Sequence, residues 1–340
     1  MNLVAFCAHM AIDEAAARAA LGSRHQDDAP WYMQVVLGLG AWVTAIAALF
    51  FVGLVMELVL DIDEPDTVIA VIGIALFAGA FWLLRRWADG PFTSHMAVAF
   101  AVAGMLLAVA GIAVPEESLW IAAVAALPFA AAAIWQQRSG LLQFLLVSIA
   151  ILVWIGAVCD HWDRLVGDLS ALTMPIGVAL LLYPPRRDLR PTAFALLVVP
   201  LAVELVGGQF EPASILWYGW PAKILFLILF GALLAINLHR LTDARTRLTV
   251  LAGAIGVIAA ALLLPTGASA ALVLLMLAYC LGSRTLAALG TLAGVYFIWV
   301  FYYDLQSTLL TKSIILMSVG AVLLLCYGLL VIAARPGRST

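Results

Sequence analysis

The feature that most constrains this chain is a succession of apolar runs separated by short polar connections. Of its 340 residues, 65% are hydrophobic and 11% are charged, and the mean hydropathy is +1.11. Soluble globular chains are about 45–50% apolar and about 25% charged. A chain with so little charge lacks the polar side chains needed to cover its surface in water. We therefore expect lipid to be the solvent for most of it.

The apolar runs predict an all-α polytopic membrane protein with about twelve transmembrane helices. A helix needs about 20 apolar residues to cross a bilayer, and it satisfies its backbone hydrogen bonds internally. Pro128, Pro175 and Pro200 lie inside spans, where proline is expected to kink a helix. The predicted spans are 34–60, 66–84, 95–114, 119–135, 141–159, 166–183, 192–207, 222–238, 248–264, 268–282, 286–303 and 313–334.

The basic residues are distributed unevenly between the two sides that these spans define. Arg164, Lys223 and Lys312 fall on the side opposite the N-terminus, and the other 14 of the 17 basic residues share its side. Cytoplasmic connections carry an excess of Lys and Arg. We therefore expect both termini in the cytoplasm, with Asp61–Asp66 and Asp160–Asp168 outside. A miscounted span would scramble this pattern, so the split also favours twelve spans.

The two ends of the chain differ from its apolar middle. Residues 1–30 are Ala-rich and charged, with Gly22 and Pro30 as helix breakers, and predict a cytoplasmic helix followed by a linker. Residues 336–340 are expected to form a cytoplasmic tail. No basic stretch followed by a short apolar run and a small-residue site indicates a cleaved signal peptide.

Two stretches share the pattern E-L-V-x-x-x-x-E-P. One runs from Glu57 to Pro65 at the end of the first predicted span, and the other from Glu204 to Pro212 at the end of the seventh. With six spans in each, the halves 31–184 and 185–335 would be parallel repeats related by an axis along the membrane normal. The alternative is coincidence, since Leu and Val are abundant throughout the chain.

Glu57 and Glu204 are the first candidates for a functional site. Charge inside a membrane is costly and therefore indicates function. The two residues are equivalent in the repeat, about one turn from the outer ends of their spans. If the halves pack against each other, the carboxylates would approach and could hold a proton or a cation. In the plainer interpretation, each Glu reaches the lipid headgroups and has no further role.

A second candidate is the outer connection between the last two predicted spans. Asp304, Thr308 and Lys312 are spaced by four residues, so they share one face of a helical turn. An ion pair or a headgroup contact between Asp304 and Lys312 explains this pattern, with a substrate site as the alternative.

Motifs for catalysis and cofactors are missing from the sequence. The four cysteines form no C-x-x-C pair, and no nucleotide-binding, zinc-protease or nucleophile-elbow motif occurs. The stretch Asp160–Asp163 contains acids and a histidine, but it lacks the spacing of a metal site and predicts a solvated loop. We expect no cofactor and no metal, and the sequence favours a protein that is not an enzyme. The basic residues form no patch for nucleic acid.

Two stretches also resemble a known family. They are "PWYMQVVLGLGAW", from Pro30 to Trp42, and "FYYDLQSTLLTKSIILMSVGAVLLL", from Phe301. Together they resemble the bacterial polytopic membrane proteins of domain of unknown function 4401 (DUF4401), over nearly the whole chain from Pro30 onward. The resemblance implies an inner-membrane protein, often encoded beside other membrane or envelope proteins. It brings no known catalytic residues with it.

Two functions of different class are compatible with these patterns. One is a permease-like protein that moves a small solute or ion at a repeat interface. The other is a non-catalytic membrane scaffold or assembly partner of other envelope proteins. The lipid bilayer is the expected partner in both, with other membrane proteins as further partners. A polar cavity between the halves would favour the permease, and a dry, leucine-filled interface would favour the scaffold.

Overall fold

The described part of the chain consists of helices and short turns, and it contains no strand. The computed structural model describes residues 36–47, 50–51, 65–86, 91–115, 117–136, 139–159, 170–182, 189–207, 220–240, 244–264 and 266–304, with single residues and pairs between 310 and 328.

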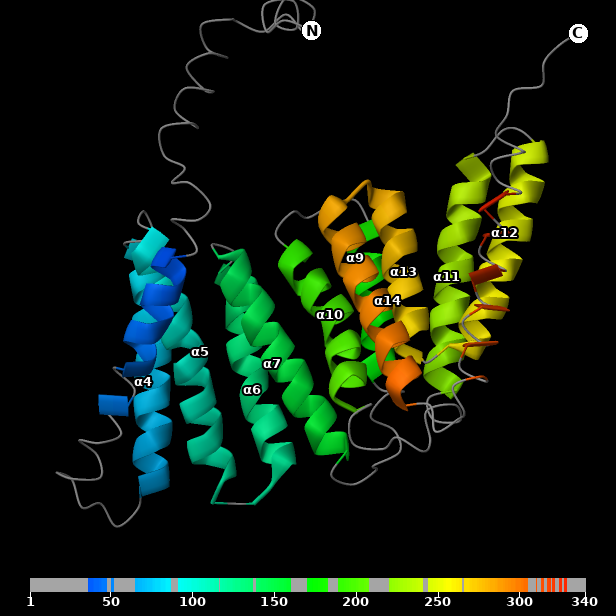
Figure 1. The fold of residues 1–340 in the computed structure, drawn as a ribbon. Coiled ribbons are helices and arrows are strands. Elements are labelled where there is room, and N and C mark those ends of the chain that lie inside the picture. Colours follow the sequence, from blue (N-terminus) through cyan, green and yellow to red (C-terminus); the bar gives the residue numbers. More distant parts are fainter. Residues whose placement is uncertain are drawn as a thin grey trace, which may run out of the picture. The chain divides into compact units, whose positions relative to one another are not determined.

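Ten helices follow the short helical segment Val36–Ala47 in this part of the chain (Figure 1). They are α4 (Pro65–Arg86), α5 (Pro91–Ala113), α6 (Leu119–Gln136), α7 (Gly140–Cys159), α9 (Thr173–Leu182), α10 (Arg190–Gly207), α11 (Trp220–Arg240), α12 (Ala244–Leu263), α13 (Thr266–Leu281) and α14 (Arg284–Asp304).

Five of these helices, α4, α5, α6, α7 and α11, are long and apolar enough to cross a membrane. The all-α membrane class predicted from the sequence is therefore confirmed. The count of twelve spans stays a prediction, because the first and last predicted spans are only partly covered by the described residues. The sixth predicted span, 166–183, corresponds to α9, which has 10 residues.

The prolines of the predicted spans differ in position. Pro128 lies inside α6 and Pro200 inside α10, as predicted. Pro175, in contrast, is the third residue of α9. In the first turn of a helix the missing N–H of proline breaks no intrahelical bond, so no kink is required there.

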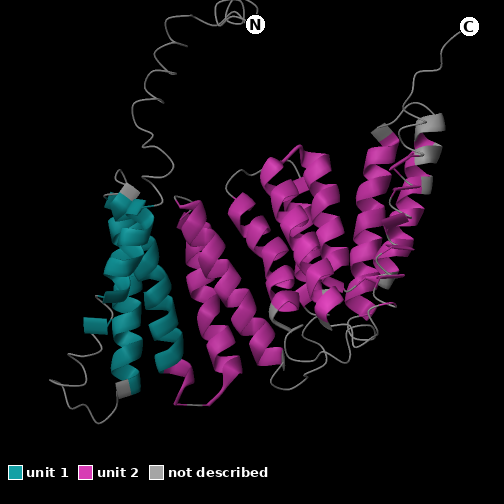
Figure 2. Cartoon of the chain, viewed as in Figure 1, with its two compact units in different colours: residues 1–111 teal, residues 112–340 magenta. Residues whose placement is uncertain are grey.

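The chain divides into two compact units, residues 1–111 and 112–340 (Figure 2). In the first unit, α4 and α5 pack through glycine. A Cβ added at Gly104 would lie 2.6 Å from the backbone nitrogen of Phe77 and 2.7 Å from the carbonyl oxygen of Gly73. A Cβ at Gly111 would lie 2.5 Å from the backbone of Ala70. Small residues permit such close approach, which is the usual way for membrane helices to associate.

In the second unit, neighbouring helices run in opposite directions. Trp120 at the start of α6 meets Trp154 near the end of α7 edge-on, with ring centroids 5.7 Å apart. The hydroxyl of Thr173 at the start of α9 donates a 2.9 Å hydrogen bond to the carbonyl of Leu196 in α10. Alternation of this kind is what successive crossings of a bilayer require.

Two pairs of non-neighbouring helices, α7 with α10 and α11 with α13, run in the same direction. Near the starts of α7 and α10, Nε2 of Gln143 donates a 2.8 Å hydrogen bond to the hydroxyl of Thr192. Toward the ends of α11 and α13, Nδ2 of Asn237 lies 2.8 Å from Sγ of Cys280. The first of these contacts is buried and the second is partly buried, so both groups find partners away from water.

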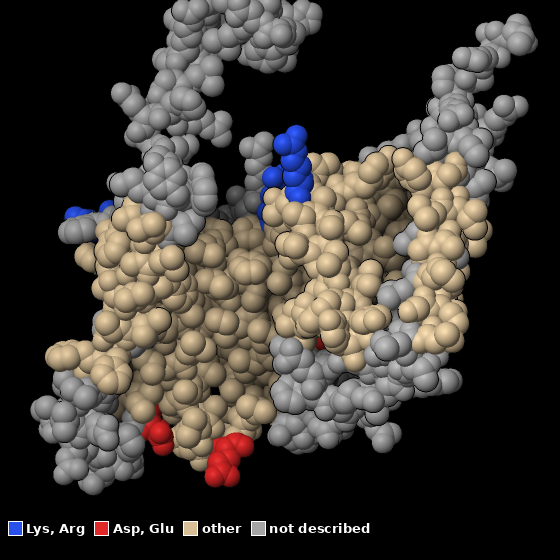
Figure 3. All heavy atoms as spheres, in the orientation of Figure 1, with Lys and Arg blue, Asp and Glu red and all other residues tan. Residues whose placement is uncertain are grey.

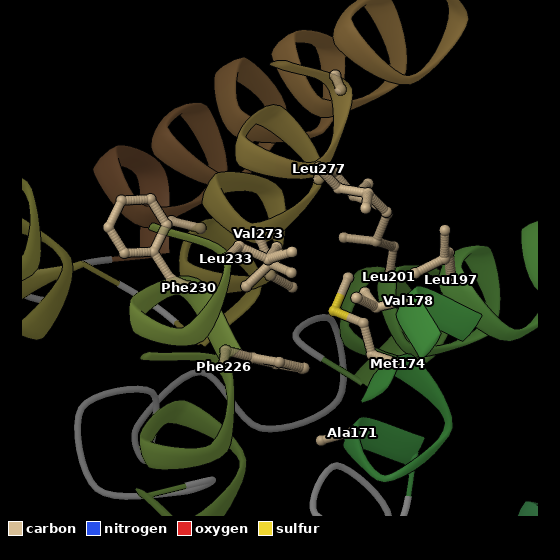
Figure 4. Packing of buried hydrophobic residues seen from close by; sticks show 14 of the residues in the cluster. Ala171, Met174, Val178, Leu197, Leu201, Phe226, Phe230, Leu233, Val273 and Leu277 are labelled. Atoms are coloured by element: carbon tan, nitrogen blue, oxygen red, sulfur yellow. The ribbon is translucent and has the colours of Figure 1, made fainter. Parts of the chain in front are cut away.

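An apolar cluster joins α9, α10, α11 and α13 in this unit (Figure 4). Its buried side chains include a methionine, phenylalanines and leucines, the composition of an apolar core. The residues labelled in the figure include Met174, Val178, Leu197, Leu201, Phe226, Phe230, Leu233, Val273 and Leu277.

The reversal between α13 and α14 is built from local hydrogen bonds. Gly282 adopts a φ of +63°, and its N–H donates to the carbonyl of Tyr279. The N–H of Ser283 donates to Ala278, which completes a Schellman motif. The Ser283 hydroxyl then accepts from the N–H of Leu286 and caps the start of α14.

The described surface is almost free of charge along the sides of the helices. Figure 3 shows the few charged side chains gathered at helix ends, with uncharged atoms between them. Large apolar side chains are exposed on these sides, among them Ile228 at 64% and Leu292 at 70%. A lipid environment accounts for such exposure, since it removes these groups from water.

Candidate functional site

The side chain of Lys223 is buried inside the second unit. It lies in the first turn of α11 and is 2% exposed. Pro221 precedes it, and proline in the first turn starts a helix without loss of a hydrogen bond. A buried ammonium is tolerated only where other groups compensate its charge. The surroundings of Lys223 therefore define a polar site within an otherwise apolar bundle.

Two backbone carbonyls at the end of α12 accept hydrogen bonds from this ammonium. Nζ of Lys223 lies 2.7 Å from the carbonyl oxygen of Leu264 and 3.4 Å from that of Leu262. The last carbonyls of a helix have no intrahelical partner and carry its negative partial charge. Lys223 thus caps α12 from the neighbouring helix.

Glu204 supplies the counter-charge. Leu197, Leu201 and Glu204 follow one another at spacings of four and three residues, so the three lie on one face of α10. Both leucines belong to the apolar cluster, which places Glu204 at its end. The half-buried carboxylate of Glu204 interacts electrostatically with the ammonium of Lys223. Opposite charges therefore lie toward one end of the cluster.

The ring of Trp220 contributes from the same turn of α11. Nζ of Lys223 lies 5.4 Å from the centroid of this ring. A cation over an aromatic face is attracted by the ring quadrupole, more strongly when the pair is removed from water. Trp220 therefore adds a further favourable interaction for a positive charge at this position.

Buried polar groups also line the start of α13, next to the carbonyls that Lys223 contacts. Thr266 is 5% exposed and Ser269 is 1% exposed. The Ser269 hydroxyl has no hydrogen-bond partner among the residues that the structure describes. An unsatisfied buried hydroxyl costs about 1–3 kcal/mol, which makes Ser269 a position where a ligand or water would be stabilised.

Helical geometry places Ser269 on the side of α13 that faces α11. Ser269 precedes Cys280 by three turns and shares its face. Cys280 contacts Asn237 of α11. Counting back equally along the two parallel helices sets Ser269 opposite Phe226, one turn from Lys223. The hydroxyl thus lies deeper along the same seam.

The structure brings together only part of the predicted site. Glu204 lies where α10 ends, as predicted, and its described partner is Lys223. Glu57 lies outside the described residues, so its pairing with Glu204 stays a prediction. Asp304 is the last residue of α14, but its side chain and Lys312 fall outside the described part of the chain, as does Asp160–Asp163.

Lys223 and Ser269 were missed by the sequence interpretation. The sequence did contain a signal for Lys223, because the predicted span 222–238 includes this residue. Its charge was nevertheless counted with those of the connections. Nothing in the sequence distinguishes Ser269 from other serines. Among the described residues, no group of three His, Cys, Asp or Glu side chains could hold a metal ion.

The long apolar helices define the class of this chain, a polytopic helical membrane protein. Within the bundle, the buried Lys223 lies at one end of the apolar cluster. A family model described as a domain of unknown function (DUF4401) matches residues 30–331. The chain belongs to this family, which confirms the resemblance drawn from its two terminal motifs. The comparisons with curated proteins and with solved structures gave no match.

Proposed function

We propose that this protein is a permease-like protein of a bacterial inner membrane that moves a small ion or solute. Both termini face the cytoplasm in this proposal, and the Lys223 site lies near the outer surface. The observation that carries it is the buried ammonium of Lys223, 2% exposed in the first turn of a helix able to span the membrane. Ionisable groups within membrane helices commonly mark ion and substrate pathways.

The surroundings of Lys223 support this function. Transporters bind charged solutes and coupling ions where helices begin and end inside the protein, because these ends present unpaired N–H and C=O groups. Here the end of α12 and the start of α13 lie beside Lys223, and the buried Ser269 hydroxyl has no partner in the described part of the chain. The plainer alternative is that Lys223 only caps α12, which would make its role structural.

Flux measurements on the purified protein test the proposal. We would reconstitute it in vesicles of phosphatidylethanolamine and phosphatidylglycerol that contain a pH-sensitive dye. Gradients of H⁺, Na⁺ and K⁺ would be imposed in turn. We expect the wild-type protein to dissipate at least one gradient faster than protein-free vesicles, and Lys223→Met to abolish that difference.

The matched control is Arg284→Gln, which removes an exposed charge at the start of α14. It should leave the flux unchanged. Equal rates for wild type, Lys223→Met and empty vesicles under every gradient would contradict ion transport. If Lys223→Met and Arg284→Gln both lost the flux, the loss in Lys223→Met would not be specific to the Lys223 site.

A membrane scaffold is the second candidate, and the apolar cluster favours it. In the proposed repeat, α9 ends the first half and α10, α11 and α13 belong to the second. Their contact is lined by leucine, phenylalanine, valine and methionine (Figure 4). An apolar contact of this kind suits a fixed bundle, since moving these helices apart would expose apolar surface. Absence of flux in every gradient, with an intact fold, would support this candidate.

A further inference from the structure

We propose that the carbonyl oxygens of Leu262 and Leu264 form a binding site for a small monovalent cation, in the electrostatic field of the Glu204 carboxylate. In the structure, the tethered ammonium of Lys223 occupies this site. The inference rests on the proposed function in using the same residues, and it defines the class of cation that the site takes when the lysine head is absent: a primary ammonium ion or an alkali cation of similar size.

The kind of atoms around Nζ carries this inference. Its described hydrogen-bond partners are two backbone carbonyl oxygens, at 2.7 and 3.4 Å. Carbonyl oxygens replace the hydration shell of alkali cations in selectivity filters. In transporters, carbonyls at helix ends coordinate Na⁺ or protons. The cradle therefore offers the ligands that a monovalent cation uses, whether the cation is free or attached to a side chain.

The charges around the cradle also favour a cation. Glu204 contributes a full negative charge, and the end of α12 contributes the negative end of the helix dipole. Trp220 presents its ring to the same position, with its centroid 5.4 Å from Nζ. Without the lysine, the two carbonyls would lose the cation that they bind in the structure.

The cradle is closed on the side of Lys223 and Leu264, which are 2% and 8% exposed, and more open at Leu262 and Trp220, which are 41% and 38% exposed. An ion the size of a methylated ammonium head would fit the space that the lysine head leaves. A quaternary ammonium has no N–H groups for the carbonyls and is larger, so it should be rejected.

The test is chemical rescue of Lys223→Ala in detergent, with methylammonium chloride as the probe. The folding equilibrium in mixed micelles would be measured against methylammonium, K⁺, Na⁺ and tetramethylammonium. We expect methylammonium to raise the folding equilibrium constant in proportion to one plus the ratio of its concentration to its dissociation constant, by about elevenfold at ten times that constant. Tetramethylammonium should give no shift, and wild type, whose site is filled, should not respond.

Two further variants make the test specific. Lys223→Met fills the volume of the lysine without its charge, and Lys223→Ala/Glu204→Gln lacks the carboxylate. Neither should respond to methylammonium. If Lys223→Ala does not survive purification, extraction with methylammonium present should raise the monodisperse fraction on size exclusion.

The proposal is overturned if methylammonium changes neither the folding equilibrium nor the monodisperse fraction of Lys223→Ala. An equal response in Lys223→Met would overturn it too, since that effect would be unspecific. The readout is binding in detergent, so a protein that binds methylammonium without catalysing flux would refute the permease alone. Flux without rescue would refute the cation site alone.

Discussion

The carboxylate of Glu204 acts electrostatically on the buried ammonium of Lys223, and we expect the two groups to be coupled energetically. Removing one partner of a buried ionic pair leaves the other uncompensated, which is costly. Removing both exchanges the pair for neutral groups and avoids that cost. The stability losses of the two single variants should therefore add up to more than the loss measured in the double variant.

A double-mutant cycle measures this coupling. We expect Lys223→Met and Glu204→Gln each to lower the free energy of unfolding, and the double variant to lose less than the sum. The interaction free energy should be about 1 kcal/mol or more, within the range for residues in one ionic network. Unfolding in mixed micelles, followed by circular dichroism, provides the four values. Additive losses would show that the residues do not interact.

The sequence predicted one half of this site and missed the other. Glu204 was found because an acid within an apolar run is rare and because it recurs in the E-L-V-x-x-x-x-E-P pattern. Its described partner, Lys223, lies 19 residues further along the chain. Which residues of α10, α11 and α12 meet depends on how the helices pack, and periodicity on one helix does not contain that information.

At the scale of single helices, the contact between α4 and α5 depends on the missing side chain of glycine. We expect Gly104→Val to separate the two helices, because a Cβ there would come within 2.6 Å of the backbone of Phe77. The cost should be about 1–3 kcal/mol, typical of overpacking. Gly79→Val on α4 is the control, since a Cβ at Gly79 would meet nothing within 4 Å.

Equal stability of the two glycine variants in mixed micelles would contradict this contact. A lower stability of Gly79→Val than of Gly104→Val would contradict it as well.

In the described part of the chain, two residues next to helix ends have a left-handed backbone conformation, and we expect their substitution to change stability in opposite directions. Glu117 adopts a φ of 48° and Gly282 a φ of 63°. Because a Cβ disfavours this conformation by about 1 kcal/mol, Glu117→Gly should stabilise the protein and Gly282→Ala should destabilise it. The same unfolding assay reads both. Destabilisation by Glu117→Gly would mean that its side chain contributes more than the backbone strain costs.

Most described helices begin and end close to the predicted bounds, because a long apolar run specifies its own length. The span predicted at 66–84 is α4, and that at 192–207 is α10. The exception is 166–183, of which α9 covers Thr173–Leu182. Hydropathy measures apolar content, and it does not indicate where a run stops being helical. The predicted span 166–183 places Pro175 inside a helix, whereas Pro175 lies in the first turn of α9.

At the scale of the whole chain, the alternating directions of the helices in the second unit support insertion by successive crossings. The contact of Trp120 with Trp154 and that of Lys223 with Leu264 each join the start of one helix to the end of the next. The duplication of 31–184 in 185–335 stays a prediction. Its test is a superposition of the two halves of an experimental structure, in which the six helices of each half should overlay in order.

Whether the end that carries Lys223 faces outward is tested most directly by thiol labelling in intact cells. The 4 native cysteines would be replaced, and single cysteines introduced at Asp63 and at Arg187. A membrane-impermeant reagent should label Asp63→Cys and leave Arg187→Cys unmodified until the cells are permeabilised, because arginine-rich connections stay in the cytoplasm. Labelling of Arg187→Cys but not Asp63→Cys, or of both in intact cells, would contradict the orientation, the twelve spans and the repeat together.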